Sequence, residues 1–150
     1  MADSTTASIA VDAPPAVIMD VISDFAAYPE WASGVRATEV LERDGAGLAS
    51  RVRFHLDAGP IKDSYVLGYR WDGTAGVRWD LAEPGSVVSG MAGGYLLADA
   101  DLGTLVTYDL AVDVRIPMLG MLKRRAEKMI IDTALKGLKE RAEARGGEQR

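Results

Sequence analysis

The sequence predicts a single α+β domain over residues 1–150, in which a curved antiparallel sheet of about seven strands wraps around one long C-terminal helix. Three observations lead to this fold class. The chain has 150 residues, which is the length of one ordinary domain. Its middle part alternates apolar and polar residues in consecutive segments joined by short turn signals, a pattern typical of antiparallel strands. Its last part holds one long segment with apolar residues at helical spacing, and no other segment is long enough to cover the sheet.

The N-terminal part is expected to form one strand and two short helices. Residues Thr5–Val11 alternate and predict the first strand. Asp12 stands before two prolines, and an acidic cap followed by proline marks the start of a helix. The segment Tyr28–Trp31 is expected to form the second short helix, which ends near Gly34. Spacings of three and four place the apolar face of the first helix on Val17, Ile18, Val21, Ile22 and Phe25.

Six further strands follow the helices, and Asp-Gly, Gly-Pro and Pro-Gly pairs mark turns between them. The first of the six runs from Val35 to Arg43. In the next strand Phe54 belongs to an apolar face, whereas Arg53 and His55 belong to the opposite face. We assign the face richer in large apolar side chains to the interior, so that His55 points to solvent. The expected interior residues are Val52, Phe54, Leu56, Tyr65, Leu67, Tyr69, Trp71, Val77, Trp79, Leu81, Met91, Tyr95, Leu97, Val106, Tyr108, Leu110 and Val112.

The last helix is expected to run from about Pro117 to Ala142, which is about 25 residues or ~38 Å at a rise of ~1.5 Å per residue. Gly146 and Gly147 are expected to end it. One helix cannot fill a strongly curved sheet along its whole length, so a cavity is expected between the two. The residues that recur at helical spacing are Leu122, Ala126, Met129, Ile130, Thr133, Leu135 and Leu138.

Composition and charge disfavour several classes of function. The chain has no cysteine and a single histidine, so we expect no disulfide, thiol catalysis, metal centre or other cofactor. The net charge of −5 disfavours a general nucleic-acid binder. We expect no membrane span, and because no basic segment precedes an apolar one at the N-terminus, we expect a cytoplasmic location. The oligomeric state stays open, a homodimer included.

Three segments carry a resemblance to a known family. They are Asp24-Phe25 with Tyr28-Pro29-Glu30-Trp31, then Gly103-Thr104-Leu105-Val106-Thr107-Tyr108, and finally Leu138-Lys139-Glu140-Arg141-Ala142-Glu143. With the order of elements, they resemble the START-like, helix-grip (SRPBCC) superfamily, in particular its polyketide cyclase/dehydrase branch. The resemblance covers nearly the whole chain and implies a helix-grip fold. Members include aromatic polyketide cyclases, lipid and quinone carriers, plant hormone receptors and proteins acting on ribosomes, so the resemblance specifies the fold and leaves the chemistry open.

The large side chains that face the expected cavity are the candidate ligand-binding residues. Several are tyrosines, and a buried phenol hydroxyl needs a partner, which water or a ligand oxygen can supply in a cavity. Methionines add flexible apolar surface, although they also fill gaps in ordinary cores. Trp31 is expected at the mouth of the cavity, either as a lid or as a clamp for the second short helix. The expected ligand-binding residues are Trp31, Phe54, Tyr69, Trp79, Met91, Tyr95, Tyr108 and Met121.

Three functions are compatible with this sequence. The first is binding or transport of a hydrophobic or aromatic small molecule, such as a lipid, a quinone or a polyketide-like compound. The second is a polyketide cyclase or aromatase, whose chemistry needs an acid and a base near a carbonyl group. A tyrosine could be the acid, and a slip of the register by one residue would bring Arg53 and His55 inside. The third is an interaction module that contacts RNA or an acidic protein through the basic helix face between Lys123 and Lys128.

Overall fold

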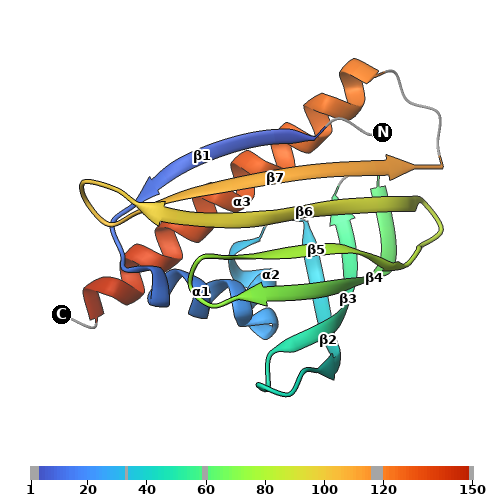
Figure 1. The fold of residues 1–150 in the computed structure, drawn as a ribbon. Coiled ribbons are helices and arrows are strands. Elements are labelled where there is room, and N and C mark those ends of the chain that lie inside the picture. Colours follow the sequence, from blue (N-terminus) through green and yellow to red (C-terminus); the bar gives the residue numbers. More distant parts are fainter. Residues whose placement is uncertain (1–3, 33, 59–60, 116–119, 149–150) are drawn as a thin grey trace.

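The structure of the protein, a computed structural model, describes residues 4–32, 34–58, 61–115 and 120–148. These residues form one sheet, two short helices, a 3-10 turn and a long C-terminal helix (Figure 1). In chain order the elements are β1 (Thr5–Val11), α1 (Pro15–Ser23), the 3-10 turn η1 (Phe25–Ala27), α2 (Tyr28–Trp31), β2 (Val35–Arg43), β3 (Ala49–Ala58), β4 (Ile61–Asp72), β5 (Gly76–Glu83), β6 (Val88–Asp99), β7 (Thr104–Val114) and α3 (Gly120–Glu148).

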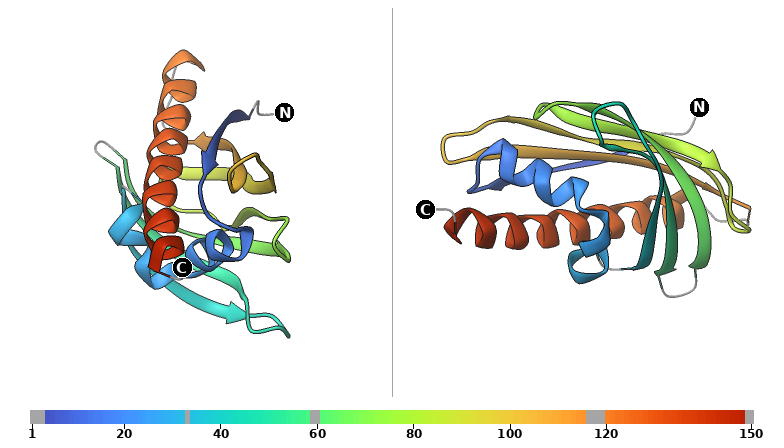
Figure 2. Two further views of the ribbon diagram at one scale, coloured as in Figure 1. Left: turned by 90° about the vertical axis from the view of Figure 1, so that its left-hand side faces the viewer. Right: turned by 90° about the horizontal axis from the view of Figure 1, so that it is seen from below.

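The sheet has seven strands in the order β1-β7-β6-β5-β4-β3-β2, and every neighbouring pair is antiparallel. Strands β2 to β7 form a meander, whereas β1 pairs with β7, far from it in the sequence. The sheet curves over α3, and α1 and α2 lie at one end of the space between sheet and helix (Figure 2). The helix-grip fold expected from the sequence is therefore confirmed.

The two faces of the sheet differ as the alternation predicts. The concave face carries the apolar core, and the convex face carries polar and charged side chains. On the convex face Arg78 donates two hydrogen bonds to Asp109, with N–O distances of 2.5 and 3.0 Å. The ring of His55 lies on the same face and is hydrogen-bonded to Ser64 Oγ at 2.7 Å and to Glu39 Oε1 at 3.1 Å. Its side chain is 25% exposed, so the strand faces are the expected ones and His55 points away from the core.

The covered face of α3 differs in part from the expected one. Leu122 and Met129, two residues of the expected stripe, are 47% and 66% exposed. The helix also continues past Gly146, which packs against Ala13 and does not end it. The expected start at Pro117 lies outside the described residues. No helix in the described part of the chain is long and apolar enough to cross a membrane. The residues of α3 that are buried include Glu127, Ile131, Ala134, Leu135, Leu138 and Ala142.

One carboxylate of α3 is buried on the side of the helix that faces the sheet. Glu127 is 2% exposed and accepts hydrogen bonds from Thr5 Oγ1 at 2.9 Å and from the backbone N–H of Val112 at 2.8 Å. The described pairing of β1 with β7 begins at Thr5 opposite Leu110, so Val112 lies just beyond it. Glu127 therefore takes the place of a strand partner there and ties the helix to both β1 and β7.

The start of α1 differs from the expected one as well. The N-cap position is Pro14, which offers no side-chain cap, and Pro15 occupies the first turn. Asp12 lies two residues before this position and is not the N-cap residue. Its backbone N–H instead donates to Glu143 Oε2 at 2.9 Å and so connects the end of β1 with α3.

Candidate ligand-binding cavity

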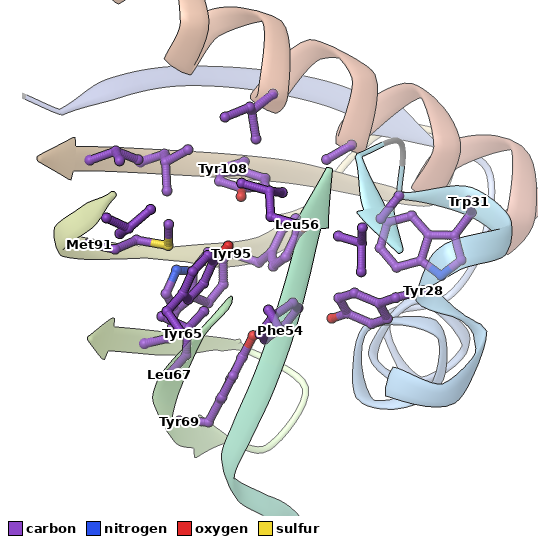
Figure 3. A pocket seen from close by; sticks show the side chains of 18 of the residues that line it. Tyr28, Trp31, Phe54, Leu56, Tyr65, Leu67, Tyr69, Met91, Tyr95 and Tyr108 are labelled. Atoms are coloured by element: carbon purple, nitrogen blue, oxygen red, sulfur yellow. The ribbon is translucent and has the colours of Figure 1, made fainter. Parts of the chain in front are cut away.

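A cavity of about 120 Å³ lies between the concave face of the sheet, α2 and α3 (Figure 3). Tyr28 and Trp31 of α2 lie at one end of it. Ile130 and Ala134 of α3 also line it. The other lining side chains come from residue 32 and from strands β2 to β7. The curved sheet and the single long helix thus leave a space between them, as expected.

Three aromatic rings form part of the wall on β5, β6 and β7. The centroid of the Trp79 ring lies 5.5 Å from that of Tyr95 and 5.5 Å from that of Tyr108, and the two tyrosine centroids are 4.6 Å apart. Gly93 makes this packing possible. A Cβ atom at this position would lie 2.5 Å from the carbonyl oxygen of Asp109 and 3.2 Å from the Trp79 ring.

The tyrosine hydroxyls of the cavity fall into two groups. The hydroxyl of Tyr28 donates to the carbonyl oxygen of Ile22 at 2.5 Å. Four other hydroxyls have no hydrogen-bond partner in the described part of the chain, and none of the four oxygens is completely enclosed by protein. They therefore border the open space, where water or a ligand oxygen can pair with them. These four belong to Tyr65, Tyr69, Tyr95 and Tyr108.

Burial raises the pKa of all five tyrosines that line the cavity. The largest cause is the loss of hydration of the phenolate, and neighbouring phenols add to it. Tyr108, for example, raises the pKa of Tyr28 and of Tyr95 further. The hydroxyls therefore stay protonated near neutral pH, as hydrogen-bond donors rather than bases.

The cavity holds no charged group within the described part of the chain, because every lining residue there is apolar or a tyrosine. The internal residues outside the described ranges, 33, 59–60 and 116–119, have no charged side chain in the sequence either. No group of three His, Cys, Asp or Glu side chains that could hold a metal ion occurs among the described residues. The site thus offers apolar surface and neutral hydroxyl groups.

Trp31 closes the cavity at α2. The residue is 8% exposed, and its indole N–H is buried without a hydrogen-bond partner among the described residues. Helix α3 approaches its backbone closely at Gly137, where a Cβ atom would lie 2.2 Å from the carbonyl oxygen of Trp31. Trp31 therefore joins α2 to α3 and lines the cavity at the same time. A movement of Trp31 as a lid stays a prediction.

Asp63 of β4 fixes the turn between β5 and β6 at the border of the cavity. Its carboxylate accepts hydrogen bonds from the backbone N–H groups of Ser86, Val87 and Val88, at 2.8, 3.0 and 2.8 Å. Burial alone would raise the pKa of Asp63, but hydrogen bonds from the backbone, that of Val88 foremost, outweigh it and lower the pKa. Because Val88 lines the cavity, this carboxylate holds part of the wall in place.

The structure places seven of the eight expected ligand-binding residues in the lining. The exception is Met121, which is 73% exposed and lies outside the lining, so its expected position is wrong. Met121 precedes the buried Glu127 by six residues, which turns it about a third of a turn away from the covered face. Whether the other seven bind a ligand stays a prediction. They are Trp31, Phe54, Tyr69, Trp79, Met91, Tyr95 and Tyr108.

Sequence reasoning identified Trp31 on α2 but missed three other lining residues on the helices, Tyr28, Ile130 and Ala134. Tyr28 stands three residues before Trp31, a spacing that puts the two side chains on one face of α2 and could have identified the pair. Ile130 and Ala134 are four residues apart on α3 and share a face for the same reason. Their direction toward the sheet could not be deduced, because the N-terminal half of α3 has apolar residues on its exposed face too.

Comparisons with known proteins agree with this architecture. The family described as polyketide cyclase / dehydrase and lipid transport matches residues 2–143 of the chain. No curated protein matches it. A START superfamily protein from Mycobacterium smegmatis is 20% identical in sequence, with a TM-score of 0.79 over 98% of this chain and 99% of that chain.

Two further solved structures are similar over almost the whole chain. The protein TTHA0849 from Thermus thermophilus is 25% identical, with a TM-score of 0.78, and the alignment covers 95% of this chain and 98% of that one. The Zhui aromatase/cyclase from a Streptomyces species is 16% identical, with a TM-score of 0.79 and coverage of 97% and 96%. At 16% and 20% identity such likeness shows the fold alone. Because the family match spans nearly the full length, the chain belongs to the polyketide cyclase/dehydrase and lipid transport family.

Proposed function

We propose that the protein binds or carries a hydrophobic, aromatic small molecule in the cavity between its sheet and α3. The observation that supports this proposal best is the lining, which combines apolar side chains with tyrosine hydroxyls that have no partner in the described part of the chain. A solid core would pair or exclude such hydroxyls, because an unpaired buried hydroxyl costs about 1–3 kcal/mol. In a binding cavity they are free to meet the polar atoms of a ligand.

The size of the cavity limits what it can hold without rearrangement. Its volume of about 120 Å³ is close to the ~150 Å³ of an apolar cavity that binds benzene. Pockets for larger ligands have about 300–1,000 Å³. A single aromatic ring therefore fits the cavity as it is, whereas a lipid, a quinone with a side chain or a polycyclic compound requires α2 or α3 to move outward.

The second candidate function is a cyclase or aromatase activity on a polyketide-like substrate, and membership of the family favours it. Ring closure with loss of water needs both a proton donor and a proton acceptor near the reacting carbonyl. Burial raises the pKa of the tyrosines, so they stay protonated and can donate hydrogen bonds but are not available as bases, and His55 lies on the opposite face of the sheet. Catalysis would therefore need a base brought by the substrate or its carrier, which makes simple binding the better-supported function.

Native mass spectrometry of the protein purified from its own source tests the proposal. We expect a population heavier than the bare chain by the mass of one small organic molecule, which is lost when the protein is denatured. Incubation with a polyketide-like ketone then separates the two functions. A carrier releases the compound unchanged, whereas a cyclase releases a product that is lighter by the mass of water. A bare chain that takes up no apolar compound would contradict both.

A further inference from the structure

We infer that the cavity discriminates by charge and hydrogen bonding: it takes uncharged molecules that carry an acceptor oxygen, such as a ketone, and rejects the corresponding carboxylates. This inference rests on the proposed function and adds the class of ligand to it. Three properties of the described residues carry it, namely the hydroxyls without partners, the lack of a positive charge in the lining, and the pairing of Arg78 and Lys123 with carboxylates.

The hydroxyls favour a ligand with an oxygen acceptor. Tyr95 and Tyr108 have ring centroids 4.6 Å apart, yet their hydroxyls do not bond to each other or to another described residue. Both border the open space, because neither oxygen is completely enclosed. A ligand without polar atoms would displace water from these groups and leave them unpaired. A ketone of the same shape accepts at least one of their hydrogen bonds, which is worth about tenfold in affinity.

The lining disfavours an anion. A carboxylate transferred into the cavity loses its hydration, and no arginine, lysine or histidine of the described residues lines the cavity to compensate for the loss. The lining tyrosines show the same loss of hydration, since burial disfavours the phenolate and raises the pKa of every one of them. A site that opposes ionisation of its own phenols also opposes an ionised ligand.

Two cations outside the lining, Arg78 and Lys123, are paired with carboxylates. Arg78 donates hydrogen bonds to Asp109 on the convex face. Lys123 donates a hydrogen bond of 2.9 Å to Asp113, which lies near the C-terminal end of β7. Glu127 is the only buried charged residue in the described part of the chain. It does not line the cavity itself, but it accepts hydrogen bonds from Thr5 Oγ1 and from the backbone N–H of the lining residue Val112. Its carboxylate would repel an anion rather than attract one.

Three compounds of nearly equal shape and one aromatic ring test the inference, namely acetophenone, ethylbenzene and benzoate. Their binding to the full chain at pH 7 is measured by isothermal titration calorimetry or by ligand-observed NMR. We expect acetophenone to bind about tenfold more tightly than ethylbenzene, because its oxygen accepts a hydrogen bond. We expect benzoate to bind at least about a hundredfold more weakly than acetophenone, because its carboxylate loses hydration without gaining a positive partner. The three compounds share the ring, so differences in affinity report the oxygen and the charge.

Two variants assign the effect to the hydroxyls. The double variant Tyr95→Phe/Tyr108→Phe keeps both rings and is expected to lose the preference for acetophenone over ethylbenzene. Thr107→Val is the control, because this hydroxyl on β7 lies outside the lining, is already hydrogen-bonded to Ser8 Oγ at 2.8 Å, and should not contribute. Circular dichroism and thermal unfolding of each variant show whether it is folded.

The outcomes separate this inference from the proposed function. If benzoate binds as tightly as acetophenone, or if ethylbenzene does, the inference is wrong while binding of hydrophobic molecules stands. If none of the three compounds binds to the folded protein, the proposed function is wrong as well. If the double variant keeps the preference for acetophenone, or if Thr107→Val loses it as well, the hydroxyls of Tyr95 and Tyr108 are not the ones that select the ligand.

Discussion

Replacement of Gly137 by alanine should weaken the protein, although the same change stabilises most helices. Gly137 lies in the interior of α3, where glycine is usually less favourable than alanine by about 0.5–1 kcal/mol. In this position the new Cβ atom would lie 2.2 Å from the carbonyl oxygen of Trp31 and 3.2 Å from its carbonyl carbon. These are backbone atoms at the end of α2, so they cannot turn aside as a flexible side chain would.

The expected magnitude follows from two opposing contributions. The methyl group gains about 0.5–1 kcal/mol from helix propensity, and forced separation of packed elements costs about 1–3 kcal/mol. We therefore expect a net loss of about 1–2 kcal/mol, which corresponds to a decrease of roughly 2–8 °C in Tm for a chain of this size. Because Trp31 lines the cavity, the displacement of α2 should also weaken ligand binding and change the tryptophan fluorescence.

Urea and thermal unfolding of Gly137→Ala measure the loss, and Gly146→Ala on the same helix is the control. At Gly146 the new Cβ would lie 3.5 Å from Ala13 Cβ, which is an ordinary contact, so this variant should be unchanged or more stable by up to ~0.5 kcal/mol. If Gly137→Ala is as stable as the wild type, α2 does not pack on α3 as described, and the closed end of the cavity is wrong.

Two more changes give distinct results. Tyr108→Ala should cost less stability than Leu138→Ala, roughly 1–2 against 2–5 kcal/mol in urea unfolding, because Tyr108 borders open space whereas Leu138 is fully buried away from it; equal losses would indicate a solid interior. Asp63→Asn should lower the free energy of unfolding most near neutral pH. Because its pKa is lower in the folded protein than in the unfolded chain, ionised Asp63 stabilises the fold fully above the ordinary aspartate pKa of about 3.9, and this contribution is lost as the pH falls through the lowered pKa. The difference in unfolding free energy between wild type and variant should therefore shrink as the pH falls from about 5 through 3.9 and on below the lowered pKa of Asp63, and a constant difference would contradict the role of this carboxylate.

Most strands of the protein could be predicted from its sequence because apolar and polar residues alternate along them. In β3, a shift of one residue would put His55 on the concave face in place of Phe54. The large apolar side chains lie on one face of the strand, and this shows which face points to the interior. The same reasoning places Tyr69, Trp79, Tyr95 and Tyr108 on the concave face, where the structure has them. The pairing of β1 with β7 was not predicted, because no local sequence pattern indicates a contact between strands that are about a hundred residues apart.

The helix α3 was harder to orient from the sequence. Its exposed face carries Met121 and Met129, and its buried face carries Glu127, so the apolar pattern alone gives the wrong direction for the first turns. The carboxylate is buried because two distant groups on β1 and β7 donate to it, which only the folded chain brings together. For the same reason, the close approach of α3 to Trp31 at Gly137 could not be predicted before the structure was known.

Binding in the cavity can be measured most directly through the methionine methyl groups. Met91 lines the cavity, whereas Met121 and Met129 are 73% and 66% exposed on α3, so the chain contains its own controls. The protein is labelled with ¹³C at the methionine methyl groups and titrated with acetophenone while methyl NMR spectra are recorded. We expect the signal of Met91 to move and saturate while those of Met121 and Met129 stay in place. Movement of Met121 or Met129 with an unchanged Met91, or no movement at all at millimolar acetophenone, would contradict binding between the sheet and α3.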